Sequence, residues 1–252
     1  MDMLAKKKEP ALTDEFIAAV AHEIRNPLSS VKMNLQVFLR SLSALSSGKE
    51  ISIPNIQEHL RVALRAVDHL ERIVNDIIDV SRPVVLECSN ENIADVMDSA
   101  LLLAEKELAD KNILVVKKIE SLPTVEVDAR RMEQAFLNIF LNSIHAMDLG
   151  GRLTIMAAAN GGMVSITVED NGKGMTREVL GRIFEPFFTT RPDGTGLGLT
   201  LSKRIIERQN GTINVESEQG KGTRVTVRVP CKQKKSGSAE SAGYEKDTHN
   251  RR

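Results

Sequence analysis

The stretch AHEIRNPLSS, residues 21–30, places an imidazole, a carboxylate and an amide close together on a predicted helix. His22 and Asn26 are four residues apart, so they share one helix face, and the apolar residues lie on the opposite face. An exposed imidazole is mostly neutral at pH 7, and its free lone pair can act as a nucleophile. Glu23 can accept the proton of the other ring nitrogen, and Pro27 should bend the helix there. A surface histidine on a coiled-coil helix also fits this spacing, so both interpretations stay open.

Three later clusters, rich in Asn and Gly, have residue types that suit a phosphorylated ligand. They are NIFLN at 138–142, DNGKGM at 170–175 and GTGLGL at 194–199. None is a P-loop, because Gly-x4-Gly-Lys-Ser/Thr is absent, and GTGLGL lacks the third-glycine spacing of a Rossmann fingerprint. Taken alone, each cluster is as typical of a helix-face amide pair, a turn or a flexible loop.

Taken together, the three clusters suit a nucleotide bound with a metal ion. Asn138 and Asn142 lie on one helix face and interrupt an apolar pattern, and amide oxygens are suitable ligands for Mg²⁺. Asp170 stands at the end of a predicted strand, where its carboxylate can accept a hydrogen bond from an adenine amino group. Glycines of the second cluster let the backbone approach a ring, and Gly196 and Gly198 lead into a helix whose N-terminal amides suit phosphates.

The histidine must be positioned by a helical hairpin in the first third of the chain. Apolar residues recur at gaps of three and four from Ile17 to Leu45, and again from Ile56 to Ile77. SSGKE at 46–50 separates the two stripes. Two helices bury little apolar surface by themselves, so we expect a dimer that forms a four-helix bundle.

From about residue 88 onward, helices and strands alternate in a different pattern. An Asn-Gly-Gly turn joins two strands as a hairpin, and a Gly-rich irregular stretch covers about 171–197. Predicted helices cover 92–112, 128–147 and 199–210, and predicted strands cover 113–119, 152–159, 163–170, 212–217 and 223–229. Helices packed with antiparallel strands indicate an α+β fold, here an α/β sandwich.

Composition narrows the environment and the partners. Lys+Arg and Asp+Glu are both 34, and there is no Trp and one Tyr, so neither charge nor aromatic stacking predicts direct binding of nucleic acid. The two cysteines form no Cys-x-x-Cys pair, which favours a reducing compartment without disulfides or zinc. The N-terminus lacks the apolar run of a signal peptide, and no stretch reaches the length of a membrane span. We expect a cytoplasmic protein, or the excised core of a membrane-bound parent.

These motifs resemble those of the sensor histidine kinases of two-component systems. HEIRNPL resembles the phosphoacceptor box, NIFLNSIHAM the N box, and DNGKGM and GTGLGL the two glycine boxes, while FEPFFTT (184–190) resembles the F box. GKGT (220–223) resembles a further, weaker box. The match covers residues 13–230 in family order, and the short lid looks most like nitrogen-regulation-type kinases.

The resemblance implies a domain organisation as well as a fold. A helical-hairpin dimerisation and histidine phosphotransfer domain would cover 13–86, and a Bergerat-type ATP-binding domain of the GHKL superfamily would cover 87–231. Residues 1–12 would form an N-terminal arm and 232–252 a disordered tail. No sensor segment precedes the histidine helix in this sequence, so we expect either an excised core or a separate sensor protein.

The resemblance also implies roles for the matching residues. His22 would be phosphorylated, Glu23 would act as its base, and Asn26 would position water when a partner's aspartyl phosphate is hydrolysed. Asn142, helped by Asn138, would hold Mg²⁺. The full set expected at the nucleotide is Asn138, Asn142, Asp170, Gly172, Gly174, Arg191, Gly194, Thr195, Gly196, Leu197 and Gly198.

Other residues near these motifs are expected to matter less. Ser143, where alanine is common in the family, should be without consequence, and His145 is as well explained as a surface residue as by a place near the nucleotide. His59, His69 and His249 are expected to be solvated and without function.

The implied activity is that of a homodimeric protein histidine kinase that uses ATP and Mg²⁺. His22 would pass its phosphoryl group to an Asp of a response regulator docked around Ser29, Ser30 and Met33, and Asn26 adds phosphatase activity toward that regulator. Transfer from ATP within one subunit or between subunits is left open. A non-catalytic adaptor would have damaged motifs, and a chaperone-like or repair ATPase of the same superfamily would lack the His-bearing hairpin.

Overall fold

The computed structural model describes residues 14–46, 53–81, 86–191 and 194–231. The expected arm at 1–12 and tail at 232–252 lie outside these ranges. Within them, no helix combines the length and the apolar character needed to cross a membrane.

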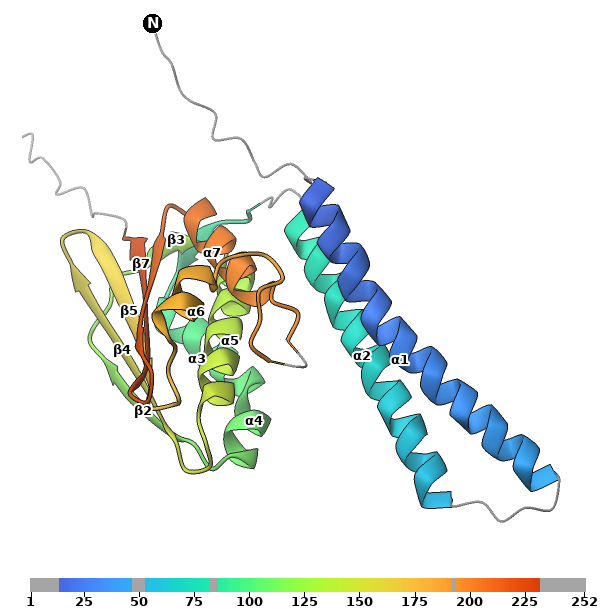
Figure 1. Ribbon diagram of the computed structural model, residues 1–252. Helices are drawn as coiled ribbons and strands as arrows, with labels where there is room; N and C mark the ends of the chain where they lie inside the picture. The colour runs from blue at the N-terminus through green and yellow to red at the C-terminus, as the bar shows by residue number, and fades with distance from the viewer. Residues whose placement is uncertain (1–13, 47–52, 82–85, 192–193, 232–252) are drawn as a thin grey trace, which may run out of the picture.

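The first two helices form the expected antiparallel hairpin. Helix α1 runs from Asp14 to Ser46 and α2 from Ile53 to Ser81, and they lie side by side beside the rest of the chain (Figure 1). Pro27 lies inside α1 without ending it, and the bend expected there stays a prediction. In a single chain the hairpin leaves many large apolar side chains exposed, among them Ile17, Leu28, Met33, Leu35, Leu39, Leu42, Leu45, Leu64 and Val67.

A buried polar contact joins the two helices of the hairpin. The Asn34 side chain is only 4% exposed, and its Nδ2 donates to the Ser30 carbonyl at 2.8 Å. This bond orients the amide, so Oδ1 faces the His59 Nδ1 at 2.8 Å, and the imidazole nitrogen must be the donor. The prediction that His59 is solvated and without function is therefore wrong, because His59 satisfies a buried amide of the opposite helix.

The rest of the chain contains a five-stranded mixed sheet with the order β2-β4-β5-β7-β6. Strand β2 pairs in parallel with β4, and the other neighbours are antiparallel. A separate two-stranded sheet joins β1 and β3. The strands are β1 Ser89–Glu91, β2 Leu114–Ile119, β3 Val125–Val127, β4 Arg152–Asn160, β5 Met163–Asp170, β6 Thr212–Glu218 and β7 Gly222–Pro230.

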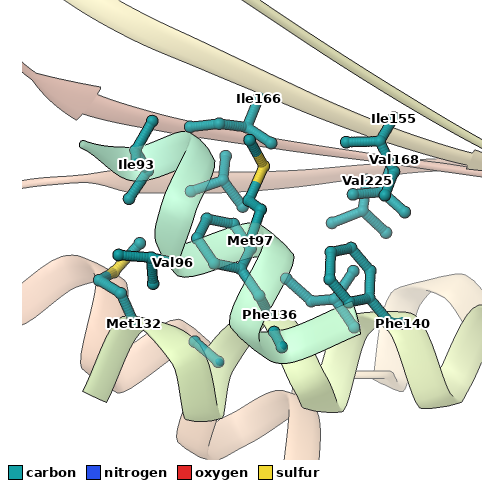
Figure 2. Close-up of a cluster of buried hydrophobic side chains, with 14 of the residues drawn as sticks. Ile93, Val96, Met97, Met132, Phe136, Phe140, Ile155, Ile166, Val168 and Val225 are labelled. Carbon is teal, nitrogen blue, oxygen red and sulfur yellow. The ribbon is translucent and has the colours of Figure 1, made fainter. Parts of the chain in front are cut away.

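Three helices, α3, α5 and α7, cover the face of the large sheet that is turned toward the hairpin (Figure 1). Figure 2 shows Met97, Phe136 and Phe140 packed against the sheet residues Ile166 and Val225, all of which are buried. The helices are α3 Ile93–Leu103, α4 Glu105–Asp110, α5 Ala129–Ala146, α6 Arg177–Arg182 and α7 Gly198–Arg208. Helices on one face of a mostly antiparallel sheet confirm the predicted α/β sandwich.

Local capping begins α5 where the sequence predicts it. Asp128 has an extended backbone, and its side chain accepts a hydrogen bond from the Arg131 amide at 3.0 Å. The predicted helix 92–112 instead divides into α3 and α4, because the Ala104 amide bonds to the Leu101 carbonyl only three residues back. The short elements β1, β3 and α6 were not predicted, since three to six residues carry little periodicity.

We predict that the Asn34–His59 contact stabilises the hairpin. Asn34→Ala should lower the free energy of unfolding by about 1–3 kcal/mol, because the His59 N–H loses its acceptor. The double variant Asn34→Ala/His59→Ala should cost less than the sum of the two single variants in urea denaturation. Lys32→Ala, at an exposed position of the same helix, is the matched control and should change stability by at most about 0.5 kcal/mol. Strictly additive single and double variants would contradict the contact.

Candidate functional site

Two adjoining cavities lie between α5, α7 and the segment 171–197. The smaller has a volume of about 160 Å³ and is lined by Asp170, Gly174 and Thr223 together with apolar side chains of α5 and the sheet. The larger, of about 240 Å³, is lined by Asn138, by four residues of the glycine-rich segment 194–198, and by two residues of α2. Residues shared by both linings are Asn142, His145, Ile183, Phe188, Thr189, Arg191 and Leu199. The shared lining makes them two parts of one site.

Asp170 is the buried acidic residue of the smaller cavity, with 7% of its surface exposed. Its Oδ1 accepts hydrogen bonds from the Gly172 amide at 2.9 Å and the Thr223 amide at 3.2 Å. The Ser143 side chain also hydrogen-bonds to it, so the prediction that Ser143 is without consequence is wrong. Burial raises the pKa of Asp170 above its ordinary value, although these hydrogen bonds act in the opposite direction. The carboxylate keeps acceptor capacity for a ligand in an otherwise largely apolar pocket.

Two glycines of the motifs adopt backbone conformations that other residues strain to reach. Gly174 has φ of 60°, and a Cβ there would collide with the Glu218 carbonyl. Gly196 has φ of 66°, and a Cβ there would collide with the backbone of Phe187. These two glycines let the loops on either side of the cavities pack against neighbouring backbone.

The two amides of α5 reach the cavities in different ways. Asn142 lines both cavities, whereas Asn138 lines only the larger and donates from Nδ2 to the Gly198 carbonyl at 3.3 Å. In the described part of the chain, no group of three or more His, Cys, Asp or Glu side chains is arranged to hold a metal by itself. Mg²⁺ is commonly held by one or two protein oxygens together with water and substrate phosphates, and the Asn142 and Asn138 amides fit that kind of site.

His145 and Arg191 stand at the junction of the two cavities. Burial, reinforced by the positive charges of Arg191 and Lys111, lowers the pKa of His145, so the imidazole is neutral near pH 7. Its buried Nδ1 makes no hydrogen bond of regular geometry with the described residues, although the Leu141 backbone one turn earlier acts to raise the pKa. Of the two interpretations of His145, the structure favours the one that places it at the binding site.

His22 is exposed on α1 and lines neither cavity. The Asn26 amide lies 3.3 Å from the His22 Nδ1, as expected for residues one turn apart, and Glu23 is half-buried beside them. The Asn34–His59 hydrogen bond shows how the antiparallel helices α1 and α2 are aligned. Counted along both helices from this pair, His22 lies opposite about residues 71–72 of α2. Arg72 belongs to the lining of the larger cavity, so the histidine and the cavity lie at one level of the hairpin.

The hairpin contacts the sandwich through polar and aromatic groups. The Thr195 hydroxyl donates to Asp76 at 2.6 Å, and the Phe16 and Phe187 ring centroids lie 5.2 Å apart. Asp79 accepts from Gln134 at 2.7 Å and from Arg131 at 3.3 Å. These contacts place α2 against the open side of the larger cavity.

Most of the residues expected at a nucleotide are brought together. Nine line a cavity, namely Asn138, Asn142, Asp170, Gly174, Arg191, Gly194, Thr195, Gly196 and Gly198. Gly172 and Leu197 line neither cavity. Gly172 instead donates its amide to Asp170, and Leu197 is buried as the N-cap of α7.

Sequence reasoning missed the roles of Ser143, Thr223, Arg72 and Asp76. GKGT (220–223) was a signal for Thr223, but no local pattern announces the two α2 residues, which reach the cavity only through docking.

Two family models match this chain. One, described as "His Kinase A (phospho-acceptor) domain", matches residues 13–83. The other, described as "Histidine kinase-, DNA gyrase B-, and HSP90-like ATPase", matches residues 127–233. Together they cover the hairpin and most of the sandwich.

Curated relatives share this core. The chain is 35% identical over 228 residues to the sensor histidine kinase ZraS of Klebsiella oxytoca, which is 90% of this chain and 48% of that protein. It is 30% identical over 229 residues to the signal transduction histidine-protein kinase AtoS of Escherichia coli K12, which is 90% of this chain and 36% of that protein. The chain thus spans about half, or less, of these relatives' length.

Solved structures share the fold of the hairpin and of the sandwich. The histidine kinase ThkA in complex with the response regulator protein TrrA matches with a TM-score of 0.72 and 26% identity, over 88% of this chain and 62% of that chain. Full-length ShkA in complex with AMPPNP matches with a TM-score of 0.61 and 27% identity, over 86% of this chain and 46% of that chain.

We predict that the Asp170 charge costs stability in the absence of nucleotide. Its pKa is raised in the folded state, so folding disfavours the ionised carboxylate. The resulting loss of stability is absent below the ordinary pKa of 3.8 and grows as the pH rises through the folded pKa. Asp170→Asn should therefore raise the melting temperature near neutral pH, with a gain that shrinks as the pH is lowered. Asp148→Asn, which makes the same replacement at an exposed position, is the control and should show no such trend. A gain that is constant with pH would assign the effect to packing instead of charge.

Proposed function

Because this chain belongs to the histidine kinase family, we propose that it transfers the γ-phosphoryl group of ATP to His22 and then to an aspartate of a response regulator. The observation that carries the proposal is the pair of adjoining cavities, with Asp170 in one part and the glycine-rich segment in the other, beside a hairpin that bears an exposed histidine. We propose the phosphotransfer domain at 13–86 and the ATP-binding domain at 87–231.

Adenine is proposed to occupy the smaller cavity, where Asp170 accepts a hydrogen bond from its amino group. The phosphates would then extend into the larger cavity, toward Arg191 and the start of α7, whose N-terminal amides favour anions. Asn142 and Asn138 are the proposed ligands of Mg²⁺, which supplies positive charge to the phosphate oxygens when bound.

The proposed chemical step uses His22 and Glu23. A ring nitrogen of His22 attacks the γ-phosphorus, the bond between that phosphorus and the bridging oxygen breaks, and ADP leaves with the electron pair. Glu23 takes the proton from the other ring nitrogen. Since His22 lines neither cavity, the γ-phosphate reaches it by a movement of the ATP-binding domain or from the second protomer. The exposed apolar face of the hairpin supports a homodimer joined as a four-helix bundle.

A response regulator is the proposed acceptor, supported by the similarity to a kinase solved in complex with one. We propose that it docks around Ser29, Ser30 and Met33, where Met33 is 61% exposed and follows His22 along α1. The Asn26 amide beside His22 is suitably placed to orient water, which supports the additional phosphatase activity toward the regulator. A separate sensor protein as the source of the signal and the nitrogen-regulation subtype stay predictions.

Labelling with γ-labelled ATP and Mg²⁺ tests the first step directly. We expect an acid-labile, base-stable label on the wild type that His22→Gln loses completely, because the nucleophile is removed. His69→Gln makes the same replacement elsewhere on the hairpin and should keep the label, since His69 lines neither cavity. Label retained in His22→Gln would overturn the proposed phosphoacceptor. Binding of nucleotide without any label in the wild type would instead favour a regulator phosphatase.

The docking surface has its own test. Met33→Glu should slow phosphotransfer from the phosphorylated chain to its cognate receiver domain by about tenfold or more, because a charge is buried at the interface. Autophosphorylation should be unchanged. Gln57→Glu adds the same charge at an exposed position of α2 and is the control. Unchanged transfer by Met33→Glu would move the docking site away from this face.

A further inference from the structure

A carboxylate of the hairpin lines the cavity that we assign to the phosphates. Asp76 of α2 lines the larger cavity together with Asn138, Asn142, Arg191 and the segment 194–198. Its Oδ2 accepts the Thr195 hydroxyl at 2.6 Å. Thr195 is the residue of the glycine-rich segment that lies between Gly194 and Gly196. An acidic group therefore stands in a cavity whose other polar groups suit an anion.

The same hydroxyl connects Asp76 to the start of α7. The Thr195 Oγ1 accepts the Leu197 amide at 3.4 Å, and Leu197 is the N-cap of α7 but offers no capping side chain of its own. The N-terminal end of a helix carries partial positive charge from its unpaired amides. Asp76 thus provides negative charge at the helix end toward which a nucleotide's phosphates would point.

A second carboxylate holds α2 against the ATP-binding domain without entering the cavities. Asp79, about one helical turn after Asp76, accepts from Gln134 and Arg131 of α5 and lines neither cavity. On the other helix of the hairpin, the Phe16 ring packs against Phe187 of the ATP-binding domain. Among the described residues, docking of the hairpin is therefore shared among several contacts, and the Asp76–Thr195 contact lies inside the phosphate cavity.

We propose that Asp76 is a specificity-determining residue that occupies the place of the nucleotide's terminal phosphates, so that phosphate binding and docking of α2 exclude one another. The inference rests on the proposed function, because it takes the larger cavity to be the phosphate site. Asp76 weakens the binding of nucleotides in proportion to the phosphate charge that they bring into the cavity. Binding of a triphosphate separates Asp76 from Thr195 and releases α2 from the ATP-binding domain.

Electrostatics gives the reason for mutual exclusion. Like charges a few ångströms apart at a partly buried site repel strongly, because water and salt screen them less than at the surface. Burial raises the pKa of Asp76 and the Asp79 charge adds to this effect, whereas the Thr195 hydrogen bond and the nearby Arg72 and His69 act in the opposite direction. The pKa is raised despite these partners, so the ionised carboxylate is disfavoured at this place. By thermodynamic linkage, docking lowers nucleotide affinity by the factor by which nucleotide weakens docking.

Calorimetric binding of a non-hydrolysable ATP analogue with Mg²⁺ tests the inference on the full chain. Asp76→Asn keeps an acceptor for Thr195 but removes the charge, and it should bind the analogue at least about fivefold more tightly than the wild type. Adenosine, which carries no phosphate, should bind the two proteins equally. Asp68→Asn, an exposed acid of α2, is the matched control and should bind both ligands as the wild type does.

Docking can be followed in the same proteins by a single tryptophan. The chain has no Trp, so Phe16→Trp introduces one reporter at the contact with Phe187. Saturating analogue should shift its emission to longer wavelength as the ring becomes solvated, whereas adenosine should not. With Asp76→Asn added, the same shift should occur at lower concentrations of the analogue.

The outcomes separate this inference from the proposed function. Equal or weaker analogue binding by Asp76→Asn, or an equal gain for adenosine and the analogue, would overturn the role of the Asp76 charge. Unchanged tryptophan emission at saturating analogue would overturn the release of α2. Failure of the wild type to bind the analogue at all would reject the proposed ATP site itself, and a thermal melt that matches the wild type would confirm that each variant is folded.

Discussion

A carboxylate removed from water must be surrounded by hydrogen-bond donors, and satisfying Asp170 organises the centre of the sandwich. Its partners are the amide of Gly172 in the loop after β5, the amide of Thr223 on β7, and the Ser143 side chain on α5. Three segments distant in sequence are thus held around one group. A ligand that bonds to Asp170 is positioned relative to the sheet, the helix and the glycine loop at once. The raised pKa means that these donors do not fully offset burial, which is typical of groups kept for binding instead of stability.

The parts of the fold with strong periodicity could be predicted from the sequence. The stripe of apolar residues from Ile17 to Leu45 predicts α1, and the Asn-Gly-Gly turn predicts the β4–β5 hairpin. Motifs likewise predicted most of the cavity lining, because the nucleotide residues are clustered in three short runs. The split at Ala104 could not be predicted, since no Gly or Pro marks it and only the short hydrogen bond of the Ala104 amide shows it.

Contacts between distant segments were the part that sequence could not supply. His59 looks like one more polar residue of an exposed helix face, and only the facing Asn34 gives it a role. A single buried polar pair of this kind sets register, because a shifted hairpin would leave both groups without partners. The level of His22 relative to Arg72 and Asp76 on α2 depends on that register. The position of the phosphoacceptor against the cavity is therefore determined by a contact far from both.

Asp76 and Asp79 of α2 differ in what can replace their partners. Asp79 is held by a guanidinium and an amide of α5, with both ion-pair side chains about 30% exposed, and a pair of this kind contributes at most about 1 kcal/mol. Asp76 is held by the neutral Thr195 hydroxyl, just before the N-terminal end of α7. A phosphate can also bind at this end of the helix. Interfaces between domains of one chain are often small and polar, so relative motion is the expected default. Because the Asp79 contact is weak and the Asp76 contact is replaceable, docking of α2 responds to what fills the cavity, without a separate regulatory site.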